Sequence, residues 1–334
     1  MTREPGIDGE AGRPFVSTGR LPAAEAVQAH VEEAYTQFRD RDDGAASEVY
    51  PALARASGDL FGICVADTSG TTYAAGDAEA GFAIMSVSKP FVFALVAEAL
   101  GPDEARARLG VNATGLPFDS RAAVEQGPDG RTNPMVNPGA IATTSLAPGA
   151  TAGAKWELIH DGLSRFAGRA LEVDEEIYAS ASDTNHRNRE LGLLLERHGR
   201  IYCDPSQAVE LYTRQCSLSV SARDLAVMGA TLADGGVNPV TRARVIDAET
   251  CHYVLAVMMT AGLYETSGDW LYEIGLPGKS GIGGGIVTVA PGKGGLGTFS
   301  PLLDRAGNSV RGQLVASFLS RRLGLDLFAS KPGA

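Results

Sequence analysis

Apolar residues recur at helical spacing near both ends of the chain. One such run directly follows Pro22, a residue that favours the start of a helix, and another closes the chain. Each run has one apolar face, which predicts two amphipathic helices that cover a core. The apolar positions are Val27, Val31, Tyr35 and Phe38 in the first run, and Leu314, Val315, Phe318, Leu319 and Leu323 in the last.

Strand patterns lie just inside these two helices. The apolar run Leu60–Ala66 leads into the turn sequence Asp67–Gly70, and Thr71–Ala75 follows. Two short strand-forming runs around such a turn predict a β-hairpin. A later apolar run, Ile286–Ala290, lies between glycine clusters and predicts a further strand.

The middle of the chain reads as helical. Trp156, Ile159, Leu163 and Phe166 share one face of a predicted helix, and a second helix ends before Gly235-Gly236. Strands and helices do not alternate as they do in a doubly wound sheet. The order predicts an α+β fold, in which both chain ends form an antiparallel sheet and a helical subdomain is inserted between its halves.

Charge and length narrow the class of protein. The chain has 334 residues and a formal net charge of −11, from 29 basic and 40 acidic residues. Nucleic acid and anionic membranes both favour basic patches, so neither is expected as a partner. The longest apolar stretches, such as Phe91–Leu100, are too short to span a bilayer.

The two ends of the chain resemble tails around a single domain. Residues 1–20 are polar and glycine-rich, without the apolar segment of a secretory signal, so we expect a cytoplasmic protein. The predicted domain spans residues 21–328, and 329–334 form a second short tail. Four cysteines, without any Cys-x-x-Cys pair, are expected to be buried free thiols; they are Cys64, Cys203, Cys216 and Cys251.

Candidate chemistry begins at Ser86-Val-Ser-Lys89, which we expect to open a helix with Phe91, Leu95 and Leu100 on its apolar face. Three residues make about one helical turn, so Lys89 lies on the same face as Ser86. A lysine freed of its proton by burial can activate a serine, which makes Ser86 a candidate nucleophile and Lys89 its base. A capping serine beside a solvated lysine would give the same four letters.

A second lysine occurs in Lys279-Ser280-Gly281-Ile282, on a predicted strand. Backbone amides of Ile282 and Ser86 could together form an oxyanion hole beside such a serine. Two sequences that resemble nucleotide-binding motifs do not meet the requirements of those motifs. Glu273 stands where a P-loop around Lys279 needs its first glycine, and Gly292-x-Gly294-x-x-Gly297 is not followed by a helix.

Several longer strings are similar to those of one known family, the serine-dependent glutaminases, which are relatives of β-lactamases and penicillin-binding proteins. The resemblance covers about Leu21 to Phe328. It rests on Ser86–Lys89, Asn133–Ile141, Arg187–Arg189, Tyr212–Ser217, Leu225–Ala233, Gly275–Ile286 and Gly307–Gly312.

The resemblance implies a β-lactamase/transpeptidase-like fold and hydrolysis of L-glutamine to L-glutamate and ammonia through a serine acyl-enzyme. It implies catalytic roles for Ser86, Lys89 and Tyr212, with Tyr212 moving protons. The implied substrate pocket adds Asn137, Asn188, Tyr264 and the backbone of Ile282. It further implies a homo-oligomer, a dimer or tetramer. No cofactor and no metal are implied, and the five histidines show no metal-ligand spacing.

One departure from the family bears on the substrate. The family usually carries a glutamate seven residues before the asparagine equivalent to Asn188, where it contacts the amino end of the substrate; here that position is Ala181. Asp183 lies two residues further on. Smaller departures are Pro138 and Met85.

Two alternatives therefore stay open beside glutaminase activity. One is a related serine amidohydrolase that acts on a small amide or ester without a free amino group, which Ala181 favours. The other is a non-catalytic glutamine-binding protein, against which the presence of both Ser86 and Lys89 argues. A cell-wall transpeptidase or β-lactamase fits less well, because the pocket strings are those of glutaminases.

Overall fold

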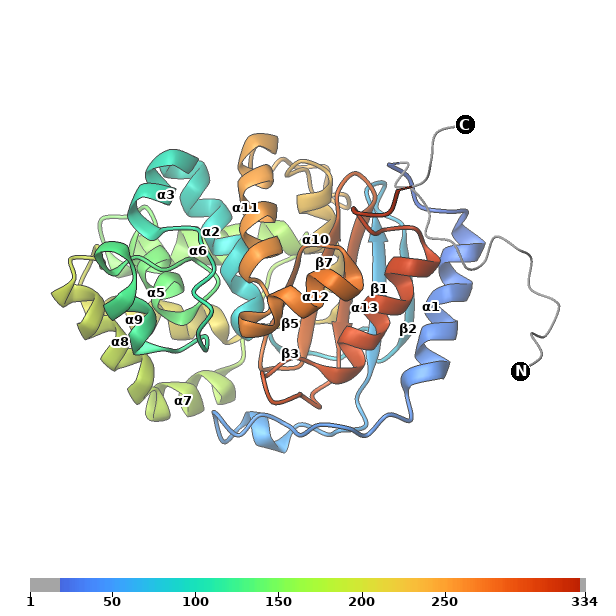
Figure 1. Cartoon of the computed structure of the whole chain (residues 1–334), viewed down its shortest axis with the longest axis horizontal. Coiled ribbons are helices and arrows are strands. Elements are labelled where there is room, and N and C mark those ends of the chain that lie inside the picture. The colour runs from blue at the N-terminus through green and yellow to red at the C-terminus, as the bar shows by residue number, and fades with distance from the viewer. Residues whose placement is uncertain (1–18, 331–334) are drawn as a thin grey trace.

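The computed structural model describes residues 19–330, and within them the chain forms a sheet layered with helices beside a helical subdomain (Figure 1). The tails predicted at 1–20 and 329–334 lie mostly outside the described residues. Segments from the two ends of the sequence, blue and red in Figure 1, lie side by side in the sheet and in the helices that cover it.

The main sheet is antiparallel and joins the two ends of the chain. Its strand order is β2-β1-β8-β7-β6, and β1 pairs directly with β8 from Gly62 opposite Phe299 to Asp67 opposite Gly294. The strands are β1 (Gly62–Asp67), β2 (Thr72–Gly76), β6 (Gly278–Ser280), β7 (Gly285–Ala290) and β8 (Gly294–Phe299). The predicted hairpin and late strand, and the α+β class, are confirmed.

One face of the sheet packs against helices from both chain ends. Helices α1 (Ala24–Phe38) and α13 (Val310–Arg322) lie side by side on it, next to α12 (Ser267–Ile274) (Figure 1). Alternate residues of β1, such as Ile63 and Val65, point into the apolar cluster that these helices complete. The two amphipathic helices expected at the chain ends are confirmed.

The other face packs against α10 (Ala222–Ala233) at unusually close range. A Cβ atom added at Gly297 would lie 2.0 Å from the carbonyl oxygen of Ala222, and one at Gly295 would lie 2.3 Å from that of Ala226. Glycine is therefore needed at both positions for the helix backbone to rest on the strand. Gly297, the last glycine of the repeat that resembles a dinucleotide motif, thus serves helix–sheet packing.

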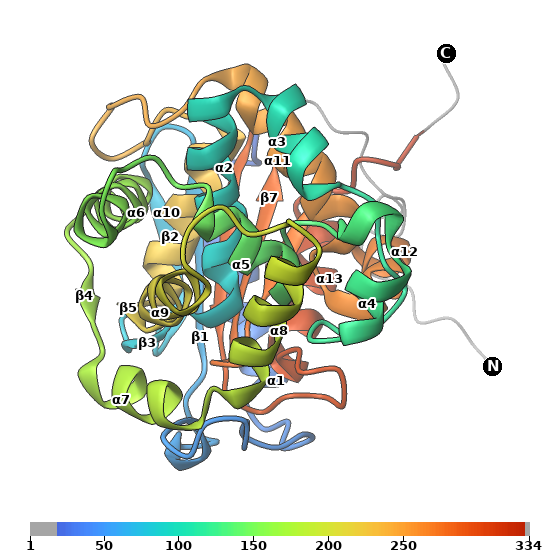
Figure 2. The same cartoon turned by 90° about the vertical axis from the view of Figure 1, so that its left-hand side faces the viewer.

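The helical subdomain surrounds α2 (Ser88–Leu100) (Figure 2). Every residue from Ser88 to Ala97 is buried, so the expectation of a single apolar face on this helix is wrong. Helices pack on it from several sides, and an all-round apolar helix is the form that such a central position favours. The other helices here are α3 (Pro102–Leu109), α4 (Arg121–Gln126), α5 (Asn137–Ser145), α6 (Ala152–Ala167), α7 (Glu175–Thr184), α8 (His186–Arg197), α9 (Pro205–Cys216) and α11 (Ala248–Ala261).

Short elements connect the two parts. A small antiparallel sheet has the order β3-β5-β4, formed by β3 (Phe82–Ala83), β5 (Leu218–Val220) and β4 (Glu172–Val173). Four 3₁₀ turns among the described residues complete the list: η1 (Leu53–Arg55), η2 (Met85–Val87), η3 (Pro128–Gly130) and η4 (Tyr264–Thr266). Two of them, η2 and η4, carry the candidate site.

All four cysteines are free thiols, as expected, but Cys203 is only half-buried. Along residues 19–330 we find no helix with the length and apolar character that a bilayer crossing requires.

Candidate active site

Ser86 lies in a strained turn directly before the central helix. It is the middle residue of η2, and α2 begins two residues later at Ser88, so Ser86 precedes the helix that it was expected to open. Met85 has a φ of 47°, and among residues 19–330 only three other non-glycine residues have a positive φ. Such strain costs about 1–3 kcal/mol and tends to occur at functional sites.

Lys89 is fully enclosed within the protein. Its Nζ donates hydrogen bonds to Asn137 Oδ1 at 2.7 Å and to the carbonyl oxygen of Met135 at 3.2 Å. Burial lowers the pKa of Lys89 from 10.5 to about 7, an effect that Cys216 and Asp119 partly oppose. At neutral pH a large fraction of this amine is therefore unprotonated, which is the form that a base needs.

Asn137 links Lys89 to two further predicted residues. Its Oδ1 accepts a hydrogen bond from the Tyr212 hydroxyl at 3.1 Å, and its Nδ2 donates to Asn188 Oδ1 at 3.0 Å. The helices α5, α8 and α9 thus each supply one member of a buried polar network around the Lys89 amine. Burial raises the pKa of Tyr212 well above 10, so its phenol stays protonated.

Tyr264 approaches the serine from the sheet side of the molecule. Its backbone has a φ of 57°, and its hydroxyl donates to the carbonyl oxygen of Ser280 at 3.2 Å. Burial raises the pKa of Tyr264 to about 12, while hydrogen bonding to the side chain of Ser86 lowers it. Tyr264 thus lies beside Ser86, and Tyr212, which contacts Asn137, lines the same cavity as Ser86.

The backbone around Ile282 borders the serine turn. A Cβ atom added at Gly281 would lie 3.2 Å from the Ser86 nitrogen and 3.0 Å from the Ile84 oxygen, so the two segments meet closely and a side chain there would crowd them. Within residues 19–330 the amides of Ser86 and Ile282 donate to no other protein group. Two free amides on adjoining segments are what an oxyanion hole requires.

A cavity opens over Ser86 and contains several of the predicted side chains. Asn137, Tyr212, Ile282 and Ala181 belong to its wall, whereas Asn188 lies behind Asn137. Lining residues that the sequence did not single out for the site are Val49, Tyr50, Phe118, Thr213 and Cys216, and Met85 was noted there only as a departure from the family.

Tyr50 is the most informative of the residues that sequence reasoning missed. Its hydroxyl donates to Asn185 Oδ1 at 3.4 Å, which ties the irregular segment before β1 to the start of α8. No local pattern marks it, because Tyr50 lies in a stretch without helical or strand periodicity. Only the tertiary fold brings it to the serine.

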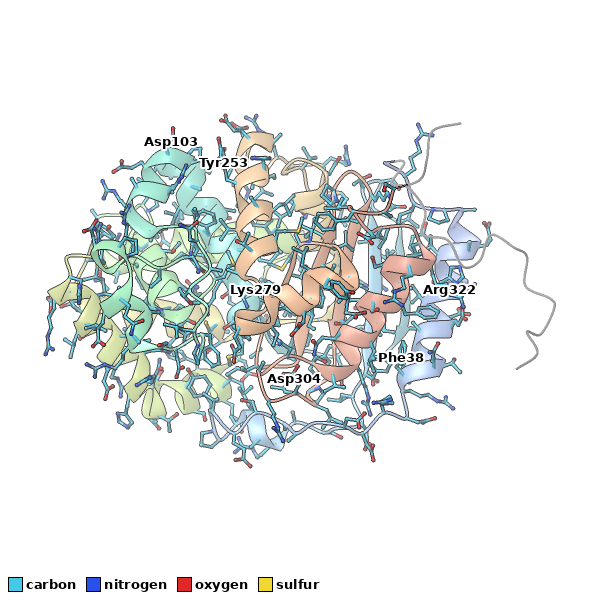
Figure 3. The ribbon with its side chains drawn as sticks, viewed as in Figure 1. Phe38, Asp103, Tyr253, Lys279, Asp304 and Arg322 are labelled. Carbon is cyan, nitrogen blue, oxygen red and sulfur yellow. The ribbon has the colours of Figure 1, made fainter. Side chains whose placement is uncertain are left out.

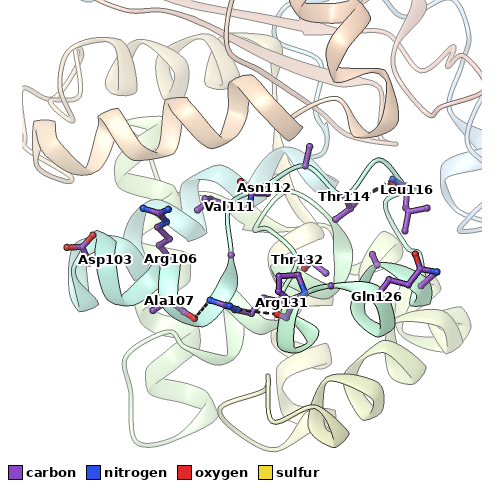
Figure 4. Close-up of a pocket in the computed structure, with 16 residues that line it drawn as sticks. Asp103, Arg106, Ala107, Val111, Asn112, Thr114, Leu116, Gln126, Arg131 and Thr132 are labelled. Atoms are coloured by element: carbon purple, nitrogen blue, oxygen red, sulfur yellow. Dashed lines mark hydrogen bonds between the residues drawn. The ribbon is translucent and has the colours of Figure 1, made fainter.

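A larger cavity lies elsewhere in the helical subdomain, between α3, α4 and the intervening loop (Figure 4). Arg131 crosses it and donates to the carbonyl oxygens of Ala107 and Pro128. This cavity does not contain Ser86 or Lys89. Within residues 19–330 no cluster of His, Cys, Asp and Glu side chains could hold a metal ion.

These features define a class of protein. An antiparallel sheet made from both chain ends, with a Ser-x-x-Lys helix between it and a helical subdomain, is the architecture of the β-lactamase-like serine enzymes. The comparisons with known proteins narrow that class to one family.

The family model described as Glutaminase matches residues 44–328. The chain is 65% identical over 318 residues to Glutaminase 2 of Yersinia pestis, covering 95% of this chain and 94% of that protein. A solved structure of probable glutaminase ybaS has a TM-score of 0.91 at 42% identity, covering 92% of this chain and 100% of that one. A structure of Mglu in its glutamate form has a TM-score of 0.86 at 34% identity, covering 91% and 70% of the two chains. The chain belongs to the glutaminase family.

Proposed function

We propose that the protein is a glutaminase that hydrolyses the side-chain amide of L-glutamine to L-glutamate and ammonia, with Ser86 as nucleophile. The observation that carries the proposal is the buried amine of Lys89, which lies one helical turn from Ser86. Burial lowers the pKa of this amine to about 7, so it can act as a base at neutral pH.

In the first half of the reaction, Lys89 takes the proton of Ser86 as the serine oxygen attacks the amide carbon. The carbonyl oxygen becomes an oxyanion, which the amides of Ser86 and Ile282 stabilise; one such donor is worth about 10²–10³ in rate. When the tetrahedral intermediate collapses, the C–N bond breaks and the nitrogen leaves as ammonia with a proton returned from Lys89. An acyl-enzyme remains on Ser86.

In the second half, water attacks the ester carbon and gives its proton to Lys89, and the Ser86 oxygen leaves with that proton. L-Glutamate is released and the starting enzyme is restored. Tyr212 and Tyr264 both stay protonated, and their hydroxyls donate to Asn137 Oδ1 and to the Ser280 carbonyl oxygen, which holds both rings at the site. Asn137 holds the Lys89 amine through its Oδ1 and belongs to the pocket wall, and Asn188 supports it from behind by accepting a hydrogen bond from its Nδ2.

Ammonia release from L-glutamine by the purified protein tests this function. Wild type should release ammonia, and rapid quenching should trap a protein heavier by one glutamyl group, with the added mass on Ser86. Ser86→Ala should show neither. Absence of ammonia with a Tm that rises in L-glutamine would instead favour the binding-protein alternative. The homo-oligomer and the cytoplasmic location expected from the sequence stay predictions.

A further inference from the structure

The cavity over Ser86 is lined by uncharged side chains alone. Its described wall contains aliphatic, aromatic, hydroxyl, thiol and amide groups and not one carboxylate. The buried amine of Lys89 donates a hydrogen bond to Asn137 and does not line the cavity. A substrate group with a positive charge would therefore enter a space that offers it no opposite charge.

Three carboxylates on the segments around the cavity are engaged elsewhere. Asp119 pairs with Arg187 at 3.4 Å, and Glu210 accepts a hydrogen bond from the Tyr178 hydroxyl at 3.0 Å. Glu176, on the same helix as Ala181, pairs with Arg55 at the exposed surface. None of these three residues lines the cavity.

Two of the neutral acceptors at the wall already have donors. Asn137 Oδ1 accepts from both Lys89 and Tyr212, which fills its two lone pairs. Thr213 Oγ1 accepts from Asn185 Nδ2 at 2.7 Å and itself donates to the carbonyl oxygen of Val209. An ammonium group would have to displace one of these bonds or remain without a full set of partners.

Ala181 keeps the cavity wall uncharged at one position. It is 2% exposed, and the neighbouring Ser180 hydroxyl accepts a hydrogen bond at 3.2 Å from the amide of Ala52. That bond holds α7 against the segment that carries Val49 and Tyr50, so the methyl group of Ala181 faces the cavity from a braced helix. A charged side chain at this position would meet the cavity, and alanine leaves it neutral.

We propose that this site recognises the terminal carboxamide of its substrate without using an α-ammonium group, so that its substrate class is linear γ-carboxamides with or without an α-amino group. The proposal rests on the proposed function and deepens it. A buried ammonium without a carboxylate gains little from the site, whereas a charge-assisted hydrogen bond is worth about 10- to 150-fold in affinity. L-Glutamine and glutaric acid monoamide, its analogue without the amino group, are therefore substrates of similar quality.

The test compares kcat/KM for L-glutamine and glutaric acid monoamide in wild type, Ala181→Glu and Ala181→Gln. Wild type should prefer L-glutamine by less than about tenfold. Ala181→Glu should increase that preference at least tenfold, and Ala181→Gln, which has the same size without the charge, should not. A tenfold or larger preference in wild type, or equal effects of the two variants, would overturn the proposal.

A pH series adds a measurement that a change in side-chain size alone would not alter. The ratio of the two kcat/KM values cancels the titration of Lys89, which acts on both amides, and leaves the titration of the substrate amine. In wild type this ratio should not fall as the α-ammonium loses its proton; a falling ratio would show that the charge is used, and would overturn the proposal. Ser86-dependent ammonia from L-glutamine with a large preference would overturn this inference alone. Absence of ammonia from both amides would remove the proposed function and this inference with it.

Discussion

The Nζ atom of Lys279 lies 4.1 Å from the centroid of the Tyr264 ring. The same atom donates hydrogen bonds of 2.7 Å to the carbonyl oxygens of Gly262 and Ser280, and Ser280 O also accepts from the Tyr264 hydroxyl. Lys279, labelled in Figure 3, thus joins strand β6 to the turn that carries Tyr264. Because Tyr264 has a positive φ, this turn needs such support to hold its side chain beside Ser86.

Lys279→Met should therefore lower kcat by about 10²-fold, with a smaller change in KM, because a displacement of about 1 Å at a reacting group has that effect. Steady-state kinetics with L-glutamine measures both constants. Lys155→Met is the matched control, since Lys155 is also buried and donates to two backbone carbonyls, those of Ser145 and Ala147. Equal losses in the two variants would count against a positioning role for Lys279.

The pH dependence of turnover should report Lys89. Its pKa is lowered to about 7, and the base acts in its unprotonated form, so kcat/KM should rise with pH through about 7 and then level off. Initial rates between pH 5 and 9 give the profile. A profile that is flat across pH 7, with the fold intact by circular dichroism, would exclude Lys89 as the base.

Removing the Lys89 amine should abolish turnover and stabilise the fold. The folded-state pKa of about 7 lies below the ordinary value of 10.5, so the folded protein binds fewer protons than the unfolded chain between these pH values. The cost of burying the amine is complete below pH 7 and declines as pH rises toward 10.5. Lys89→Met should raise the free energy of unfolding by on the order of 2 kcal/mol at pH 6.

Urea unfolding at pH 6 and pH 9 checks the sign of this pH dependence. The advantage of Lys89→Met over wild type should be smaller at pH 9, because wild-type Lys89 is then already neutral in the folded state. An advantage that grows with pH would contradict the lowered pKa.

The packing of α10 on β8 should not tolerate a single methyl group. Gly297→Ala places a Cβ atom 2.0 Å from the Ala222 oxygen, and the strand and helix must separate to relieve it. We expect a loss of about 3 kcal/mol in unfolding free energy. Gly268→Ala in α12 is the control, because no atom lies within 4 Å of its added Cβ; it should be neutral or stabilising by up to about 1 kcal/mol. Thermal unfolding of both variants decides, and similar Tm values would refute the close-packing argument.

Local patterns predicted the frame of this protein well. The helical spacing of Val27 and Val31 correctly predicted α1, because this helix buries only one face. The turn sequence Asp67–Gly70 correctly predicted the hairpin of β1 and β2. The same reasoning failed at α2, which is buried on every side. A helical pattern shows which face of a helix is buried only where polar residues mark the exposed face. In α2 the apolar residues from Phe91 to Ala97 follow one another with no polar residue between them.

The sequence by itself determined the residues able to do chemistry: a serine and a lysine one turn apart, a second lysine on a strand, and alanine at 181. The tertiary structure decided what each of them does. It buried Lys89 against Asn137, set Tyr264 next to Ser86, and brought Tyr50 into the pocket wall. The reason is physical: residue type and spacing fix the chemistry of a side chain and its reach along one helix, whereas burial and charge depend on segments that meet only when both chain ends close the sheet.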